Sequence, residues 1–206
     1  MNTIQKLADF FSRFPGIGPR QSKRFVYFLL SKDKNFLKEI SDLILKLKDD
    51  IKMCCFCYRY FPGQKEGAEK CEVCTNAQRD KSILMVVEKD TDFENIEKNG
   101  VYKGLYFILG GVIPVLEKKP ENKIRAKELV KRIEKDVKEN GLKEIIFATS
   151  LSAEGENTRD FLNDLLKPIA EKNKIKISTL GRGLSTGTEL EYIDLETIKN
   201  ALKNRI

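Results

Sequence analysis

All five cysteines of this 206-residue chain lie between residues 53 and 74. Four of them form two C-x-x-C pairs, Cys54 with Cys57 and Cys71 with Cys74, and thirteen residues separate the pairs. Two such turns can converge on one tetrahedral ion, and four thiolates leave no position on zinc for a water or a substrate. The spacing predicts one structural zinc ion per chain; the alternative is a set of buried or free cysteines. Cys55 has no C-x-x-C partner, so we expect it to pack or to have no role.

The segment "FPGIGPRQSKRF", residues 14–25, combines a glycine-rich corner with a basic stretch. Two glycines predict a tight turn between helices, and the proline that follows suits a first helical position. Backbone N–H groups at the start of the second helix would point outward, where the helix dipole favours an anion. This is the form of a helix-hairpin-helix, which holds nucleic-acid phosphates and contacts no bases. The candidate DNA contacts are Gly16, Gly18, Arg20, Lys23 and Arg24.

That assignment has an alternative, because glycines also make ordinary corners between helices. The hairpin would then be purely structural, or it would pack against a second copy in a dimer. DNA binding and dimer packing can also coexist.

Acidic residues follow two of the predicted strands. Glu88 ends one apolar run and Asp92 comes four residues later, while Glu154 and Glu156 follow the run at 144–149. Carboxylates at the carboxyl edge of a parallel sheet are typical of toprim domains, in which they hold magnesium. The later strand, however, ends in Ser-Leu-Ser rather than in an acidic pair, so a magnesium site is incomplete unless Glu154 and Glu156 substitute in part. The alternative is that all four are solvated surface acids.

The periodicity of apolar residues gives the elements that must position these groups. Helical spacing occurs at 3–14, from residue 19 through about 29, and at 35–50. After the cysteines, short apolar runs predict buried strands at 82–88, 104–110, 144–149 and 175–180. Helices are predicted between these strands, and the clearest are 123–139 and 158–171. A last helix is predicted at 195–202. Strands alternating with helices predict an α/β fold with a parallel sheet.

Composition limits the classes of function. The net charge is +7 and the pI about 9.0, and residues 1–30 hold five cations and one anion, a net of +4. A basic chain suits a polyanionic partner, although a solvated lysine surface gives the same total. The absence of histidine excludes imidazole-based catalysis and the common catalytic zinc sites. The first residues lack the pattern of a signal peptide and no long apolar run follows, so we expect a cytoplasmic protein.

Taken in order, these features resemble the RecR family of bacterial recombination mediators. The likeness spans nearly the whole chain, and it is carried by "PGIGP" with its basic helix, the four paired cysteines, "VVEKDTD" (86–92), "AEGENT" (153–158) and "GTELEYID" (187–194). The resemblance implies a helix-hairpin-helix region for DNA binding and oligomerisation at 1–52, a four-cysteine zinc finger at 53–76 and a toprim domain at 80–178. It also implies a Walker-B-like C-terminal segment and helix at 179–206, expected to contact another subunit.

The resemblance further implies a function in DNA repair. Members of the family form dimers and a tetrameric ring that can encircle DNA, work with RecO and RecF, and help to load RecA onto strands coated by single-strand-binding protein. They are not known as enzymes. Glu88, Asp92, Glu154 and Glu156 would then face partner proteins or a weakly held magnesium ion. The rival hypothesis is a magnesium-dependent toprim nuclease or primase-like enzyme, and a third is a structural adaptor that never touches nucleic acid.

Overall fold

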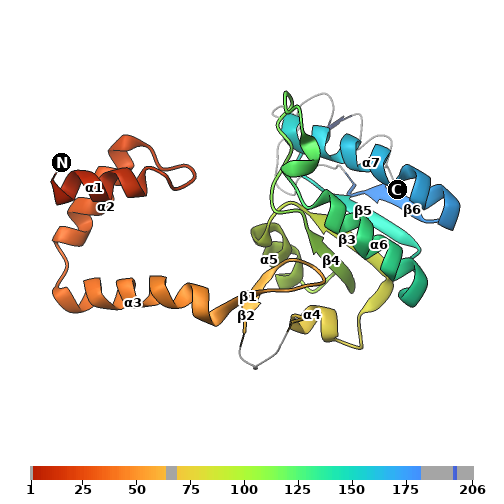
Figure 1. Cartoon of the computed structure of the whole chain (residues 1–206), viewed down its shortest axis with the longest axis horizontal. Coiled ribbons are helices and arrows are strands. Elements are labelled where there is room, and N and C mark those ends of the chain that lie inside the picture. The colour runs from red at the N-terminus through yellow and green to blue at the C-terminus, as the bar shows by residue number, and fades with distance from the viewer. Residues whose placement is uncertain (1, 64–68, 182–196, 199–206) are drawn as a thin grey trace. The chain divides into compact units, whose positions relative to one another are not determined.

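The structure is a computed structural model, and it describes residues 2–63, 69–181, 197 and 198. The chain divides into two compact units, residues 1–52 with 62–64 and residues 53–61 with 65–206. The α-helices and β-strands of both units are labelled in Figure 1. Each unit is described by itself.

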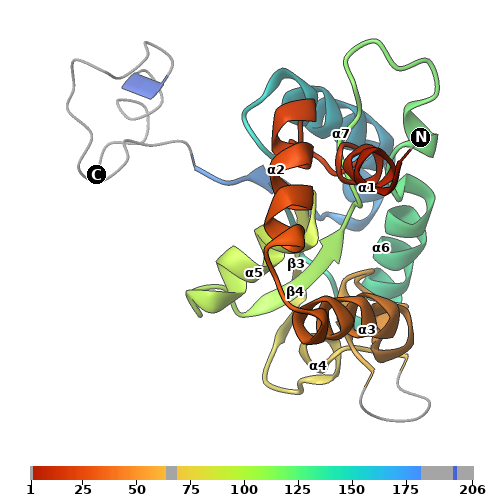
Figure 2. The same ribbon diagram turned by 90° about the vertical axis from the view of Figure 1, so that its left-hand side faces the viewer.

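The first unit consists of three helices: α1 (Thr3–Phe11), α2 (Pro19–Leu30) and α3 (Lys34–Asp50). α1 and α2 lie against each other (Figure 2). The side chains of Asn2 and Asp33 accept hydrogen bonds from backbone N–H groups in the first turns of α1 and α3. α1 ends at Phe11, three residues before the predicted end, because the chain turns there toward Gly16, whose φ of +76° is left-handed.

The second unit is built on a four-stranded sheet with the order β4-β3-β5-β6. The strands are β3 (Asp80–Val87), β4 (Gly104–Ile108), β5 (Glu144–Ala148) and β6 (Lys176–Thr179), and every pairing is parallel. This confirms the predicted α/β fold with a parallel sheet. Because successive side chains of a strand point to opposite faces, the apolar runs supply two separate cores.

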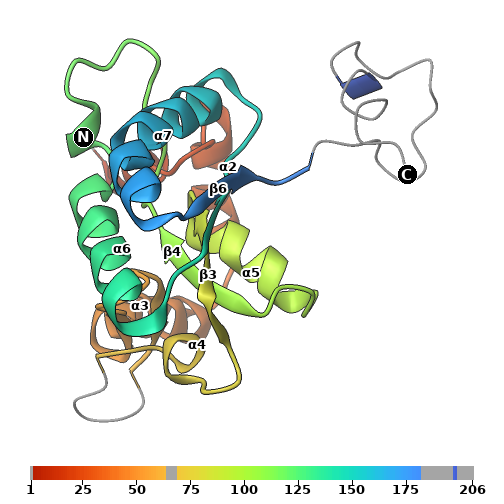
Figure 3. The ribbon, with the colours of Figure 1, turned by 90° about the vertical axis from the view of Figure 1, so that its right-hand side faces the viewer.

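Helices cover both faces of this sheet. α6 (Ala126–Asn140) and α7 (Ala153–Asn173) lie side by side on one face, and α5 (Asp90–Lys98) lies on the other (Figure 3). Leu84 and Val86 of β3 pack with the α6 and α7 side, whereas Met85 and Val87 pack with α5 and the cysteine segment. The sheet therefore joins the cysteine segment to the main core.

Several short elements complete the fold. β1 (Ile51–Met53) and β2 (Tyr60–Pro62) form a two-stranded ribbon that flanks the first cysteine pair. Cys71 is the N-cap of α4 (Glu72–Thr75), which contains Cys74, and η1 (Pro120–Asn122) precedes α6. α7 begins at Ala153 instead of the predicted 158, since the Ser152 hydroxyl accepts a hydrogen bond from Gly155 N and caps the helix. The predicted helix 195–202 lies outside the described residues, apart from 197 and 198.

Candidate metal centre and nucleic-acid interface

The sulfurs of Cys54, Cys57, Cys71 and Cys74 all lie within 4.8 Å of one another. The Cys57 and Cys71 sulfurs are 3.5 Å apart. Four sulfurs around a tetrahedral zinc ion, each at about 2.3 Å, would lie about 3.8 Å apart. The described residues contain no other group of three or more cysteine, aspartate or glutamate side chains so placed. The four cysteines can therefore hold one metal ion, and Cys55 is exposed outside the group.

The backbone around the sulfurs has the form of a metal knuckle. The N–H groups of Phe56 and Cys71 donate to the Cys54 sulfur at 3.4 and 3.3 Å. Tyr58, the residue after the pair, has a φ of +62°, which is uncommon for a residue with a side chain. Its N–H donates to Cys54 O at 3.0 Å and its ring packs on Phe107, so the turn is fixed from two sides.

The thiols also act on one another. Cys57, Cys71 and Cys74 donate hydrogen bonds toward Cys54, and these contacts lower the pKa of the Cys54 thiol far below its ordinary value. Desolvation raises the pKa of the exposed Cys55 thiol, and the neighbouring Cys54 charge adds to the effect. Cys55 is set apart by geometry, because its sulfur is not among the four that lie close together.

The knuckle is attached to the edge strand of the sheet. Ile108 N in β4 donates to Cys57 O at 2.8 Å, and Arg132 Nη1 in α6 donates to Phe56 O at 2.7 Å. Arg132 also forms a buried ion pair with Asp136, 2.6 Å away. The first cysteine pair is thus held by both β4 and α6.

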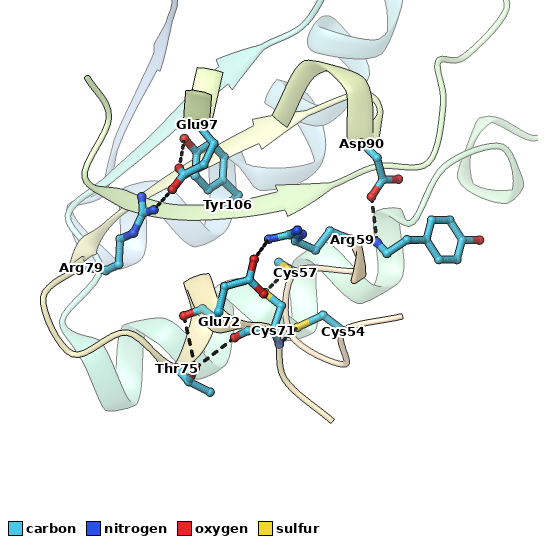
Figure 4. Close-up of polar contacts among 11 residues, drawn as sticks. Cys54, Cys57, Arg59, Cys71, Glu72, Thr75, Arg79, Asp90, Glu97 and Tyr106 are labelled. Carbon is cyan, nitrogen blue, oxygen red and sulfur yellow. Dashed lines mark hydrogen bonds and ion pairs between the residues drawn. The ribbon is translucent and has the colours of Figure 1, made fainter. Parts of the chain in front are cut away.

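The second pair is held by α4 and an arginine (Figure 4). Arg59 donates to the Glu72 carboxylate at 2.7 Å, and its guanidinium lies 4.3 Å from the Phe93 ring centroid in α5. Thr75 Oγ1 donates to Cys71 O, which closes the short helix. Tyr60 N donates to Asp90 at the start of α5, so the ribbon is fixed to the same helix.

Arg79 and Glu97 line the same pocket, of about 520 Å³, as Arg59 and Glu72. Arg79 pairs with Glu97, and Tyr106 Oη donates to the same carboxylate at 3.0 Å (Figure 4). Sequence reasoning missed Arg59, Arg79 and Arg132 because each contacts a residue on another element: Glu72, Glu97 and Phe56. Only Arg132 with Asp136 carries a local signal, the four-residue spacing of a helical ion pair.

The predicted basic hairpin occurs in the first unit. Gly18 is the residue before α2, no side chain caps the helix there, and Pro19 is at its first position. Arg20, Lys23 and Arg24 are exposed, and none has a carboxylate within 4.0 Å among the described residues. Arg24 has only a long hydrogen bond, 3.4 Å, to Gln21. The N-terminus of α2 therefore offers uncapped N–H groups beside three free cations.

The four predicted acids have different surroundings. Glu88 is only 6% exposed and its carboxylate accepts a hydrogen bond from Ser150 N at 2.6 Å. Asp92 accepts a hydrogen bond from Lys89 N and caps α5, and Glu156 lies 3.7 Å from Arg159. Glu154 is exposed in the first turn of α7. These carboxylates are not brought together as an ion-binding group.

Gly155 is the residue that lets α7 pack closely against the end of β5, near Glu88. A Cβ on Gly155 would lie 2.2 Å from Ser150 O, so only glycine lets the first turn of α7 approach the end of β5 this closely. The "AEGE" motif, residues 153–156, thus has a packing reason in addition to its acids.

No helix in the described part of the chain is long and apolar enough to span a membrane.

Comparisons with known proteins agree with this architecture. The family model described as "Toprim domain" matches residues 82–181, and that described as "RecR, C-terminal" matches residues 183–206. A "Recombination protein RecR" of Chloroherpeton thalassium is 35% identical over 204 residues, covering 99% of this chain and 96% of the relative. One of Bifidobacterium longum subsp. infantis is 35% identical over 202 residues, covering 98% and 94%. With a toprim sheet, a four-cysteine centre and full-length relatives of this similarity, the chain belongs to the RecR family.

Proposed function

We propose that this protein is a non-catalytic recombination mediator in DNA repair that acts as an oligomeric DNA clamp. The observation that carries the proposal is the N-terminus of α2, where Arg20, Lys23 and Arg24 are exposed without ion pairs, among the described residues, beside an uncapped turn. Phosphates can bind there through N–H groups and cations, which gives affinity without base specificity. Membership of a recombination protein family supports the assignment.

The four cysteines are proposed to hold zinc as a structural ion. Four sulfur ligands are typical of structural zinc, and every ligand position is then occupied by protein. The proposed organisation is a hairpin region at 1–52, the finger at 53–76, the toprim domain at 80–178 and a C-terminal segment at 179–206. We place DNA contact and oligomerisation in the hairpin region and a further oligomer contact in the C-terminal segment.

The toprim domain is proposed to act through partners and not through chemistry. Glu88, the acid at the end of β3, is buried and bonded to a backbone N–H, and the described carboxylates are not gathered for magnesium. The exposed Glu154 is suited to a positively charged partner. From the family we propose RecO, and also RecF, as partners, and loading of RecA as the outcome.

The test of DNA contact is charge reversal in the hairpin. Arg20→Glu combined with Arg24→Glu should weaken binding of labelled DNA by at least about tenfold and should reduce its salt dependence, because each lost duplex phosphate contact lowers the slope by about 0.9. The matched control is Lys34→Glu with Lys38→Glu, which makes the same charge change on exposed residues of α3. Native mass and metal content should be unchanged in both variants. Binding of the hairpin variant equal to that of the control would reject the proposal, as would a strong preference for one base sequence.

A further inference from the structure

Three cationic side chains surround one aromatic ring of the metal knuckle. Lys70 Nζ lies 4.1 Å and Lys135 Nζ 4.6 Å from the centroid of the Phe56 ring, and Arg132 Cζ lies 4.7 Å from it. The residues come from the finger and from α6. We call Phe56, Lys70, Arg132 and Lys135 the knuckle patch.

The cations of the knuckle patch are only partly neutralised. Arg132 pairs with Asp136, but its Nη2 is buried with no hydrogen-bond partner among the described residues. Lys135 reaches Glu139 only at 3.9 Å, and both side chains are about half exposed. Lys70 is exposed and has no carboxylate within 4.0 Å in the part of the chain that the structure describes. An aromatic face attracts an ammonium group without cancelling its charge, so both lysines remain able to bind an anion.

The positive charge continues along α6. Lys127, Lys131, Lys135 and Lys138 are exposed and are spaced by four, four and three residues, which places them on one side of the helix. We call them the lysine stripe. Neighbours four residues apart are about 6 Å apart along the helix axis, so the stripe presents its charges in a row. Within the described residues, Lys135 is the only stripe member with a carboxylate within 4.0 Å.

One structural explanation is that the cations balance the negative charge of four metal-bound thiolates. It accounts for Arg132, which is buried and bonded to the knuckle backbone. It does not account for the rest of the lysine stripe. In the described part of the chain, Lys127, Lys131 and Lys138 make no hydrogen bond, ion pair or cation–π contact with the knuckle. Glu128 and Glu134 lie three or four residues from Lys131 and Lys138, spacings at which ion pairs stabilise a helix. Among the described residues, however, neither carboxylate lies within 4.0 Å of a stripe lysine, so such pairing does not neutralise the stripe.

From this arrangement we infer that the knuckle patch and the lysine stripe form a second contact for the phosphodiester backbone of DNA. Its ligand is a run of phosphates, and Phe56 is a positioning residue that holds two ammonium groups at the finger end. The inference rests on the proposed function, because it assigns a further DNA surface to a DNA clamp. It differs from the hairpin site in residues and in unit, so the two can be tested apart.

The test uses the full-length protein with a labelled thymidine homopolymer and a labelled mixed-sequence duplex of equal length. Lys70→Gln with Lys135→Gln should weaken binding about three- to tenfold, and the salt slope should fall by about 1.4 on the single strand or about 1.8 on the duplex. The matched control is Lys167→Gln with Lys172→Gln, exposed residues of α7 that are in neither cluster. This control should bind as the unmodified protein does.

A second variant tests the lysine stripe without changing any residue near the metal centre. Lys131→Gln with Lys138→Gln changes stripe residues outside the knuckle patch and the cysteine cluster, so it should weaken binding while metal content stays at one ion per chain. Phe56→Leu should lower affinity and salt slope by a smaller amount, because the lysines remain but lose their fixed positions.

The outcomes separate this inference from the proposed function. If the unmodified protein binds neither DNA, both fail. If hairpin variants lose binding while the patch and stripe variants bind like the α7 control, the second contact is rejected and the clamp stands. Loss of metal from the patch variant with normal binding by the stripe variant would show that the cations serve only the metal centre, and would also overturn the inference.

Discussion

Gly16 and Gly18 lie two residues apart in the hairpin, but the structure requires glycine at only one of them. Gly16 has a φ of +76°, which a side chain disfavours by about 1–2 kcal/mol. Gly18 has a φ of −83° and a ψ of 172°, which any residue can adopt, and a Cβ added there would meet no atom within 4 Å. Gly18 is the N-cap of α2, where glycine is better than alanine, and the absence of a side chain also lets a ligand approach the free N–H groups closely.

Substitution of Gly18 by alanine should therefore weaken DNA binding more than it affects the fold. The added methyl group would keep a phosphate away from the N–H groups of α2, and loss of such charged hydrogen bonds should cost about 1.5–3 kcal/mol of binding free energy. Fluorescence anisotropy with labelled duplex, together with thermal unfolding, measures both effects. Gly16→Ala is the contrasting variant, since its main effect should be on stability. Undiminished binding by Gly18→Ala would mean that phosphates do not reach this turn.

At the scale of elements, the metal knuckle stabilises the edge of the sheet. β4 is an outer strand, and its Ile108 N–H would be unpaired without Cys57 O. Cys54, Cys57 and Cys71 are at most 1% exposed and belong to the same core as Met85 and Val87 of β3. α4 has only four residues, too few for a stable helix by itself, so its position depends on Cys71 and Cys74. The finger and the toprim sheet are one packed structure.

Loss of the metal should consequently destabilise the sheet as well as the finger. Cys71→Ser should leave less than one zinc ion per chain and lower the melting temperature, because a buried ligand is lost from a centre that helps to hold β4. Metal analysis and thermal unfolding test this. Cys55→Ser is the matched control and should retain both the ion and the stability, since Cys55 is exposed outside the cluster. A full complement of zinc in the Cys71 variant would exclude the four-sulfur site.

The elements also show what the sequence could predict. The four apolar runs identified the strands to within two residues at either end, because strands buried in a parallel sheet leave a continuous apolar signal. The sequence predicted helices between the strands but gave no bounds for α5, since its sequence DTDFENIEK has few apolar residues and packs largely through Phe93. The cysteine spacing predicted the cluster, but not that Arg59 and Arg132 would hold it. Arg59 and its partner Glu72 are 13 positions apart in the sequence, and Arg132 and its partner Phe56 are 76 positions apart. Local sequence patterns contain no information on such pairs.

The same limit applies to the acids. The position of Glu88 at the end of β3 was predicted, but its burial and its bond to Ser150 depend on how closely α7 approaches β5. That approach depends on Gly155, which the sequence presents only as the middle of an acidic motif. The place of a residue along a strand could be predicted from the sequence. Its hydrogen-bond partner could not, because that partner depends on how elements far apart in the sequence pack together.

At the scale of the whole molecule, the first unit is short of buried surface. Among its described residues the buried side chains are those of Ala8, Ser22 and Val26, and α3 has none. Large apolar side chains of α2 and α3 are exposed instead, including Tyr27, Phe28, Leu30, Leu43, Ile44 and Leu47. Apolar surface of this extent on a small helical unit is typical of a face that packs against another chain. We therefore expect the first unit to be an oligomer contact as well as a DNA contact.

Disruption of that apolar face should lower both the assembly state and the affinity for DNA. Ile44→Glu with Leu47→Glu adds two carboxylates to the apolar side of α3, and native mass spectrometry should show a smaller assembly than that of the unmodified protein. DNA binding should weaken although Arg20, Lys23 and Arg24 are intact, because a clamp gains affinity from several hairpins held on one DNA molecule. Leu45→Glu is the control, since Leu45 is 72% exposed and lies off the stripe that contains Ile44 and Leu47. If the double variant keeps the native mass of the control, α3 is not the contact; if it loses mass but binds DNA as tightly, each hairpin acts alone and the clamp mechanism is wrong.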